Sequence, residues 1–348
     1  MASMAPSKNP KGPAVLIATP NLCLDRTQFV TELVPGAVVR ALQVEVTAGG
    51  KGVNIARVVR AHGCQATLVG LVADNDRGHL LGLLRGEGAD VVDVPMPGDA
   101  RMAMIIIERP GGRITVLNEP GSTLPARSWQ DYRRAVERAL PGRRVMACSG
   151  SLPPGAPADA YGQLVELAHR AGVPALVDTA PAALRASLAS GPDLVAPNVA
   201  EAEAAISGGS GAVLAEADTD VRERAATAAL TLCELGARAA AVTAGAEGVA
   251  LATAESAQVR WLPTVRVDVV SAVGAGDSLL AGVLLAVHSS ERGASIDWRE
   301  AVLRGVATAT ASCEQLRAGG VDPRRVEKLL GQVRELAAAE QPAPRGGA

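Results

Sequence analysis

Residues 269–278 read Val269-Val270-Ser271-Ala272-Val273-Gly274-Ala275-Gly276-Asp277-Ser278, an apolar, strand-like run that meets glycines just before an apolar helix expected over residues 279–287. Glycines at a helix start leave the backbone N–H groups of Gly274, Ala275 and Gly276 unobstructed, and with the helix dipole these groups form an anion site. Asp277, directly behind that site, is placed to accept a proton from a hydroxyl group. A glycine turn with Asp277 as a helix cap explains the same spacing, and spacing alone leaves both interpretations open.

A second glycine-rich run is Thr47-Ala48-Gly49-Gly50-Lys51-Gly52-Val53-Asn54, which leads into a helix pattern. It lacks the spacing of a Walker A loop. Gly49 and Gly50 would let a sugar approach the backbone, with Asn54 hydrogen-bonding its hydroxyls and Lys51 meeting a phosphate. Lys51 is one of four lysines in a chain that carries most of its positive charge on arginine. A surface lysine on a turn remains the alternative.

Three further motifs follow expected strands, and open α/β sheets bind ligands at such strand ends. They are Ser149-Gly150-Ser151-Leu152-Pro153-Pro154-Gly155, Pro197-Asn198-Val199-Ala200-Glu201 and Thr243-Ala244-Gly245-Ala246-Glu247-Gly248. Asn198 and Glu201 offer oxygen ligands that suit a hydrated magnesium ion, although a helix start capped by Asn198 fits equally. The third motif suits a close approach to nucleotide phosphates, and a plain glycine turn explains it as well.

Working outward, short β-rich runs alternate with longer helical patterns along most of the chain. This alternation predicts an α/β fold with a doubly wound, mainly parallel sheet between helices. The expected strands are residues 14–18, 66–72, 144–148, 174–177, 194–196 and 239–243, and the expected helices are residues 51–62, 128–140, 158–171 and 221–235.

Two segments break the alternation, since residues 27–46 and 101–117 are β-rich without an intervening helix. We expect them to pair into a small β lid, the second folding as a hairpin at Arg109-Pro110-Gly111-Gly112. The run Gly208-Gly209-Ser210-Gly211 is typical of a flexible insertion, and residues 1–13 and 337–348 are expected to be flexible tails. Residues 14–335 are therefore interpreted as a single domain.

Composition narrows the classes of function. The formal net charge is -2, so no global field favours nucleic acid or an anionic membrane. Five well-separated cysteines without a Cys-x-x-Cys pair suit free thiols in a reducing compartment. No signal-peptide or membrane-spanning pattern is present in the sequence, which favours a cytoplasmic location.

In this order, the five motifs together resemble those of the ribokinase-like (pfkB-type) carbohydrate kinases, most closely the branch of 1-phosphofructokinases and tagatose-6-phosphate kinases. The resemblance covers about residues 14–335 and rests most strongly on Gly49–Asn54 and Val273–Ser278. It implies an ATP-dependent kinase that phosphorylates a hydroxyl of a hexose phosphate with the help of Mg²⁺. It also implies that the β segments form a lid, through which two copies would dimerise.

The resemblance further implies roles for individual residues. Asp277 would be the catalytic base, and the amides of Gly274, Ala275 and Gly276 would form the anion hole. The positions implied to bind the sugar are Asp25, Gly50 and Asn54, and those implied to bind its phosphate are Arg101 and Ser151. The glycine-rich run itself adds Gly49 as a sugar-binding candidate and Lys51 as a phosphate-binding one. The nucleotide loop would be Thr243, Ala244, Gly245, Ala246, Glu247 and Gly248, and the metal would be held near Asn198, Glu201 and Asp178.

This chain departs from the family pattern at Leu22-Cys23, where a Pro-Ala pair is usual, and at Ala103, where an asparagine is common. These departures leave the sugar open. The alternatives are a kinase of an unphosphorylated sugar or nucleoside, and a catalytically silent regulator of the same fold. A Rossmann dehydrogenase is disfavoured, because no Gly-x-Gly-x-x-Gly follows the first expected strand.

Overall fold

The computed structural model describes residues 15–109, 112–209 and 220–339. Within these residues a nine-stranded sheet has the order β13-β12-β11-β10-β9-β8-β1-β4-β5. The strands from β11 to β5 are parallel, whereas β12 and β13 are antiparallel additions at one edge. The strands are β1 (Val15–Ala18), β4 (Ala66–Ala73), β5 (Asp90–Met96), β8 (Val145–Ser149), β9 (Ala175–Asp178), β10 (Leu194–Val195), β11 (Ala239–Thr243), β12 (Val249–Thr253) and β13 (Ser256–Leu262).

Helices cover both faces of this sheet. Two buried clusters divide along β1, because Val15 and Ile17 pack on one face and Leu16 and Ala18 on the other. The first face carries α1 (Lys51–Ala61), α2 (Arg77–Gly86), α8 (Ala275–Ser289), α9 (Trp298–Cys313) and α10 (Pro323–Ala339). The second carries α3 (Ala126–Ala139), α4 (Ala160–Arg170), α5 (Pro181–Ser187), α6 (Val199–Ser207) and α7 (Val221–Glu234), with short 3-10 helices η1 (Leu188–Ser190) and η2 (Gly245–Glu247) in the connections.

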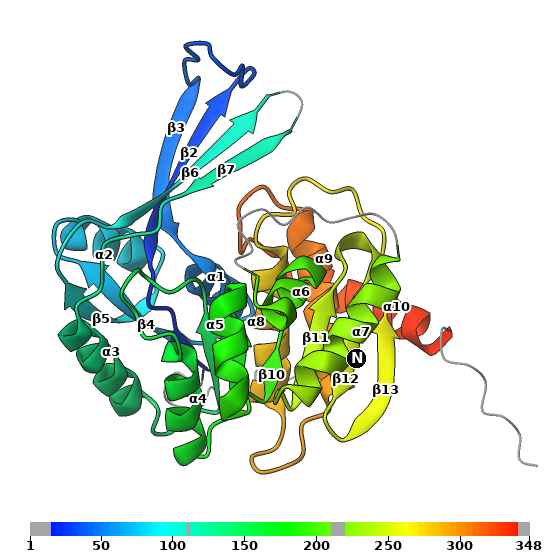
Figure 1. Cartoon of the computed structure of the whole chain (residues 1–348). Coiled ribbons are helices and arrows are strands. Elements are labelled where there is room, and N and C mark those ends of the chain that lie inside the picture. The colour runs from blue at the N-terminus through cyan, green and yellow to red at the C-terminus, as the bar shows by residue number, and fades with distance from the viewer. Residues whose placement is uncertain (1–14, 110–111, 210–219, 340–348) are drawn as a thin grey trace, which may run out of the picture.

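A separate four-stranded sheet projects from the body (Figure 1). Its order is β3-β2-β6-β7, and its strands are β2 (Cys23–Val30), β3 (Gln43–Gly49), β6 (Arg101–Glu108) and β7 (Ile114–Asn118). The two β-rich segments thus pair as predicted, through the parallel contact of β2 with β6. The first segment is longer than expected at both ends, so Asp25 and Gly49 belong to strands of the lid.

Three expectations about local structure were wrong. Residues 269–273 are not a strand, because the N–H groups of Val270 and Ser271 both donate to the carbonyl of Cys313 at the end of α9, and Val269 is 64% exposed. The expected C-terminal tail begins too early, since α10 continues to Ala339 and Ala337 is buried in the core. Gly208 is the left-handed cap of α6, with φ of 75°, rather than part of a flexible insertion.

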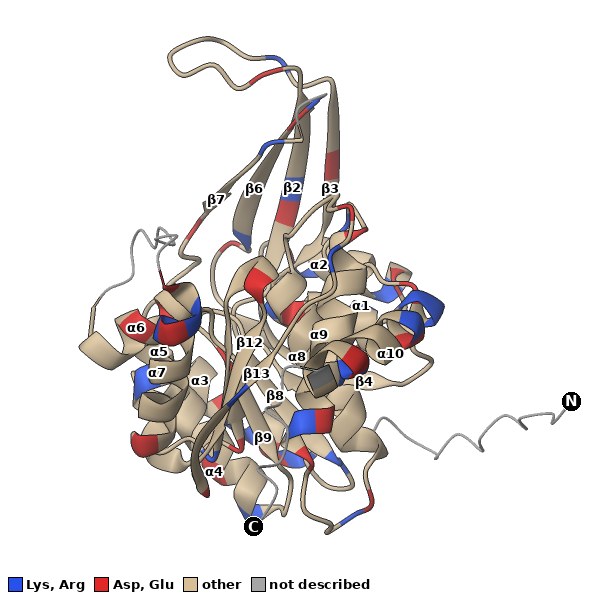
Figure 2. Cartoon of the chain, turned by 90° about the vertical axis from the view of Figure 1, so that its right-hand side faces the viewer, with Lys and Arg blue, Asp and Glu red and all other residues tan. Residues whose placement is uncertain are grey.

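Residues 1–14, 110–111, 210–219 and 340–348 lie outside the described part, so the remaining expectations for the termini, the hairpin turn and the insertion stay predictions. Lys, Arg, Asp and Glu are interspersed over the helices (Figure 2), in agreement with the small net charge. Among the described residues, no helix combines the length and the apolar character required to cross a membrane.

Candidate active site

The predicted site residues gather at one edge of the large sheet. Ser149 ends β8, Asp178 ends β9 and Thr243 ends β11, while Asn198 lies three residues after the end of β10. These strands are parallel neighbours, so their carboxyl ends meet. A backbone bridge between Asn198 and Thr243 further joins the expected metal and nucleotide segments. This is the edge at which doubly wound sheets bind ligands.

Asp277 lies in the first turn of α8, behind the left-handed Gly274, whose φ is 81°. Its side chain is only 5% exposed, and its Oδ2 accepts a hydrogen bond of 2.8 Å from Asn54 Nδ2. No side chain caps α8. The cap interpretation of Asp277 is therefore not what the fold adopts, because this carboxylate is directed at Asn54 from the second glycine-rich run.

Burial raises the pKa of Asp277 to about 6. The Lys51 ammonium opposes this shift, the nearby Asp178 carboxylate adds to it, and the hydrogen bond from Asn54 lowers the pKa. A carboxyl group with a pKa near neutrality suits general base catalysis, since it is ionised at pH 7 and still accepts a proton.

Lys51 lies at the start of α1, and its Nζ is 2.7 Å from Asp178 Oδ1. Burial lowers the pKa of this ammonium group, but the carboxylates of Asp178, Glu201 and Asp277 outweigh that effect and raise it overall. Lys51 is therefore charged in the resting site and paired with Asp178. Its expected contact with a substrate phosphate stays a prediction.

Asn198 and Glu201 form a capping box at the start of α6. The Asn198 side-chain oxygen accepts from the Glu201 amide at 2.8 Å, and the Glu201 carboxylate accepts from the Asn198 amide at 3.0 Å. The interpretation of Asn198 as the cap of a helix start is thus confirmed. Burial also raises the pKa of Glu201, with Lys51 opposing and Asp178 adding to the shift, so this cap belongs to the electrostatic network of the site.

The residues expected to hold a metal offer few free ligands. No group of three His, Cys, Asp or Glu side chains could enclose an ion within the described ranges. Asp178 Oδ2, however, is buried without a hydrogen-bond partner, and an oxygen donor of this kind suits Mg²⁺. The site would therefore accept a hydrated ion beside Asp178, since Asn198 and Glu201 are already engaged in the capping box.

The helix start of α8 presents unpaired amides. Among the described residues, the N–H groups of Gly274 and Gly276 have no acceptor, whereas Ala275 donates to the carbonyl of Ala272 at 3.2 Å. A Cβ atom placed on Gly276 would meet no atom within 4 Å. The anion hole predicted for Gly274, Ala275 and Gly276 thus has two free donors and open space, while the Ala275 amide already serves a turn.

Asp25 lies opposite Thr47 in the β2–β3 pair, and its side chain reaches diagonally to Gly49. A Cβ atom on Gly49 would lie 1.9 Å from Asp25 Oδ1, so only glycine leaves room for this carboxylate. Burial raises the pKa of Asp25, while hydrogen bonding from Cys23 and the positive charges of Arg57 and Arg101 lower it. The neighbouring Gly50, with φ of 107°, forms the N-terminal boundary of α1.

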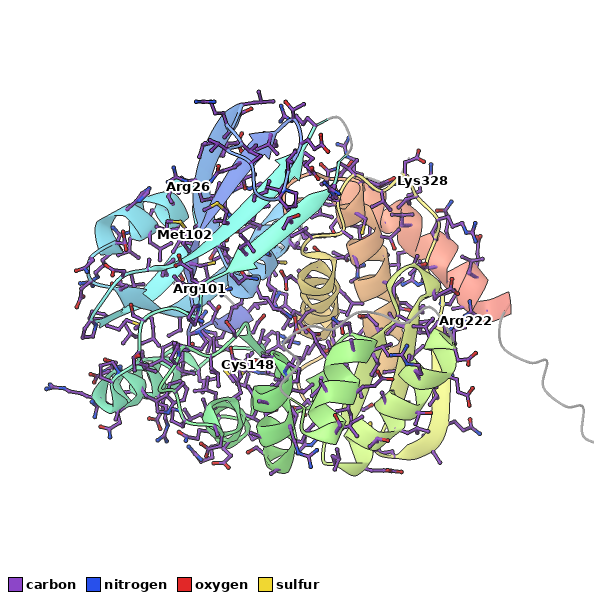
Figure 3. The ribbon with its side chains drawn as sticks, turned by 45° about the horizontal axis from the view of Figure 1, so that its top comes forward. Arg26, Arg101, Met102, Cys148, Arg222 and Lys328 are labelled. Carbon is purple, nitrogen blue, oxygen red and sulfur yellow. The ribbon has the colours of Figure 1, made fainter. Side chains whose placement is uncertain are left out.

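Arg101 begins β6 at the base of the lid, where Figure 3 shows it near the body, while Arg26 lies farther along β2. Arg101 Nη1 is 3.4 Å from Ser151 Oγ, and Asn21 Nδ2 donates to the same hydroxyl at 3.0 Å. The structure thus brings together two of the three residues predicted to bind the substrate phosphate, whereas the third, Lys51, is paired with Asp178. It adds Asn21, which sequence reasoning missed.

The predicted nucleotide loop is a tight turn between β11 and β12. Its amide at Ala244 donates to the carbonyl of Gly248 at 2.8 Å, and residues 245–247 are exposed on η2. Gly248 has φ of 134°, and a Cβ atom there would lie 2.5 Å from the carbonyl of Leu262. The glycine is therefore required by the turn, and nucleotide binding stays a prediction.

Sequence reasoning also missed Arg57, whose Nη1 donates to Asn54 Oδ1 at 2.9 Å. The sequence held a usable signal for this contact, because Arg57 follows Asn54 by three residues in the expected helix, and residues three apart on a helix lie on the same face. For Asn21 the sequence held no such signal, since its partner Ser151 is 130 residues away.

In sequence, residues 18–324 match the family described as "pfkB family carbohydrate kinase". The chain belongs to this family. The 1-phosphofructokinase of Rhodobacter capsulatus is 32% identical over 270 residues, covering 76% of this chain and 80% of that protein. The 1-phosphofructokinase of Xanthomonas campestris pv. campestris is 33% identical over 177 residues, covering 51% of this chain and 56% of that enzyme. The latter match spans little more than half of its relative.

Solved structures of the pfkB family and its neighbours share the architecture. Phosphofructokinase-2 from Escherichia coli in complex with potassium has a TM-score of 0.79 and 26% identity, covering 93% of this chain and 100% of that chain. Ribokinase from Thermotoga maritima, at 18% identity and a TM-score of 0.65, covers 92% of this chain and 100% of that one, and shows the fold alone. The predicted ribokinase-like doubly wound fold and the carbohydrate kinase class are confirmed.

Proposed function

We propose that this pfkB-family kinase transfers the γ-phosphoryl group of ATP to a hydroxyl of a hexose phosphate. The observation that carries the proposal is the placement of Asp277, which is buried behind the free amide of Gly276 and oriented by Asn54. The names of the relatives supply the substrate class, since two of them are 1-phosphofructokinases.

In the proposed reaction Asp277 accepts the hydroxyl proton as the hydroxyl oxygen forms a bond to the γ-phosphorus, and the bond to the departing ADP oxygen breaks. The amides of Gly274 and Gly276 stabilise the charge on the transferring group. Mg²⁺, when bound near Asp178 and Glu201, would neutralise nucleotide phosphate charge. Lys51, paired with Asp178, lies at the same end of the site.

Arg101 and Ser151 are proposed to bind the phosphate that the substrate already bears. A dianionic group under the lid needs a charged, bidentate partner, and the guanidinium of Arg101 supplies one beside the Ser151 hydroxyl. Asp25 and Asn54 would hold the sugar hydroxyls. The departures at Cys23 and Ala103 leave the choice of hexose to experiment.

A coupled assay of ADP release tests this proposal with fructose 1-phosphate, fructose 6-phosphate, tagatose 6-phosphate and the free sugars. Asp277→Asn should lower turnover roughly 10²-fold or more with little effect on binding. Arg101→Met should raise the KM for the hexose phosphate about tenfold or more and leave that for ATP unchanged. A wild-type preference for free sugar would instead favour a kinase of unphosphorylated sugars.

For the chain as a whole, we infer that residues 14–335 act as one kinase domain, that the protein works in the cytoplasm and that it dimerises through its lid. The family match over residues 18–324 supports the first, and exposed apolar side chains on the lid, including Leu42 and Leu117, support the last. A tetrameric inhibited form is known for phosphofructokinase-2 from Escherichia coli.

A further inference from the structure

The Arg57 side chain lies beside the proposed active site, on α1, and is only 12% exposed. Its guanidinium makes five hydrogen bonds, as many as it has N–H groups. Two go to the carboxylate of Glu87, at 2.7 and 2.9 Å, and one goes to Asn54 Oδ1 at 2.9 Å. The others reach the carbonyls of Ala48 at 2.6 Å and Ala318 at 3.5 Å.

The contact with Asn54 fixes the orientation of its amide. Because Oδ1 accepts from Arg57, Nδ2 must face the other way, where it donates to Asp277 Oδ2 at 2.8 Å. A reversed amide would place an oxygen atom against the ionised carboxylate and lose both hydrogen bonds.

The two carbonyl contacts tie together the segments that carry the chemistry. Ala48 precedes the glycine that makes room for Asp25. Ala318 packs against Gly274, where an added Cβ atom would lie 3.0 Å from the Ala318 side chain. Arg57 thus links the second glycine-rich run to the segment that packs against Gly274 of the first, although it reaches no proposed reacting atom itself.

We propose that Arg57 is a positioning residue for phosphoryl transfer, anchored by Glu87 and acting on Asp277 through the side chain of Asn54. The inference rests on the proposed role of Asp277 as base. Glu87 is suited to the anchor role, since a second arginine, Arg317, also donates to it at 2.5 Å.

The first test compares Arg57→Met with Arg60→Met. Arg60 lies one turn along α1, and it and Arg57 both line a cavity of about 390 Å³. The Arg60 side chain makes no hydrogen bond or ion pair in the described part of the chain. Arg57→Met should lower kcat about tenfold or more and change the KM for ATP less than about twofold, since misplacing a base affects chemistry rather than nucleotide binding. Arg60→Met should keep wild-type kcat.

A double-mutant cycle then separates positioning from general support of the fold. In an Asn54→Ala background, Arg57→Met should cost less than about threefold in kcat, because the residue through which it acts is already gone. An equal loss in both backgrounds would show that Arg57 acts through its backbone contacts instead, and would overturn the inference.

If Arg57→Met does not fold, as judged by thermal melting, Glu87→Gln takes its place in the same cycle. A kcat loss that disappears in the Asn54→Ala background supports the inference, and a loss equal in both backgrounds, or no loss, refutes it. Asp277→Asn is measured in parallel. If that variant keeps wild-type turnover, the base assignment fails, while the cycle still reports whether Arg57 acts through Asn54.

Discussion

At the scale of single residues, the site depends on charges that are held close together and away from water. Lys51 is in hydrogen-bond contact with Asp178, and Asp277 lies within the electrostatic reach of both. Removing one partner would leave the others uncompensated in a partly buried site, which costs far more than at the surface. The raised pKa of Asp277, and with it the proposed role as a base, therefore depends on the whole group of charges.

The pH dependence of the reaction follows from the pKa of Asp277, which burial raises to about 6. Only the ionised carboxylate accepts a proton, so kcat/KM should fall as the pH drops through about 6. The hydrogen bond from Asn54 lowers this pKa, and Asn54→Ala should move the acidic limb to higher pH. Rate profiles between about pH 5 and about pH 8 provide the measurement. An acidic limb that does not move in Asn54→Ala would contradict the assignment.

Gly49→Ala tests the space reserved for Asp25. The added methyl would overlap Asp25 Oδ1, at 1.9 Å, and must displace this carboxylate. We expect the KM for the sugar substrate to rise about tenfold or more, with the KM for ATP nearly unchanged. Gly82→Ala, at a position in α2 where a Cβ atom meets nothing within 4 Å, is the control. Equal sugar KM values in the two variants would refute the role of Asp25.

At the scale of elements, the residues of the proposed site lie at the ends of strands and at the start of one helix. The apolar run before α8 is a loop, and this allows Gly274 to adopt its left-handed conformation against Ala318. The helix then begins with free amides that face open space. The N-terminal start of α8 thus supplies the proposed anion site.

Gly276→Val separates this role from folding. A valine Cβ would meet no protein atom within 4 Å, so the variant should keep a melting temperature close to that of wild type. Its side chain would nevertheless fill the space in front of the amides, and turnover should fall roughly 10²-fold or more. A folded variant with wild-type kinetics would exclude the anion site from catalysis.

At the scale of the whole molecule, the lid and the body are one chain folded into two sheets. β2 and β6 pair in parallel although their first residues, Cys23 and Arg101, lie 78 positions apart in the sequence. Arg101 thereby stands where the lid meets Ser151 of the body. Lid movement would therefore change the contacts of the proposed phosphate site.

The exposed apolar side chains of the lid predict its use as an interface. Leu42 is 65% exposed and Leu117 59% exposed. Replacing both by lysine should shift the protein from dimer to monomer in light scattering after size-exclusion chromatography, because charge disfavours burial at an interface. Leu336→Lys, on α10 in the body, is the control. Dimers that resist the lid changes would place the interface elsewhere.

The sequence by itself determined the class of fold, since buried-strand runs alternate with helical patterns. It also predicted the chemistry now proposed for the two glycine-rich runs, from their residue types and order. Tertiary structure alone decided that Val270 and Ser271 lie outside the sheet, where their amides donate to the end of α9, and that Asn21, 130 residues from Ser151, meets it in space. It also decided that Arg57 orients Asn54. The physical reason is that local pattern encodes burial and helix or strand preference, whereas hydrogen bonds between distant segments exist only once the core has packed.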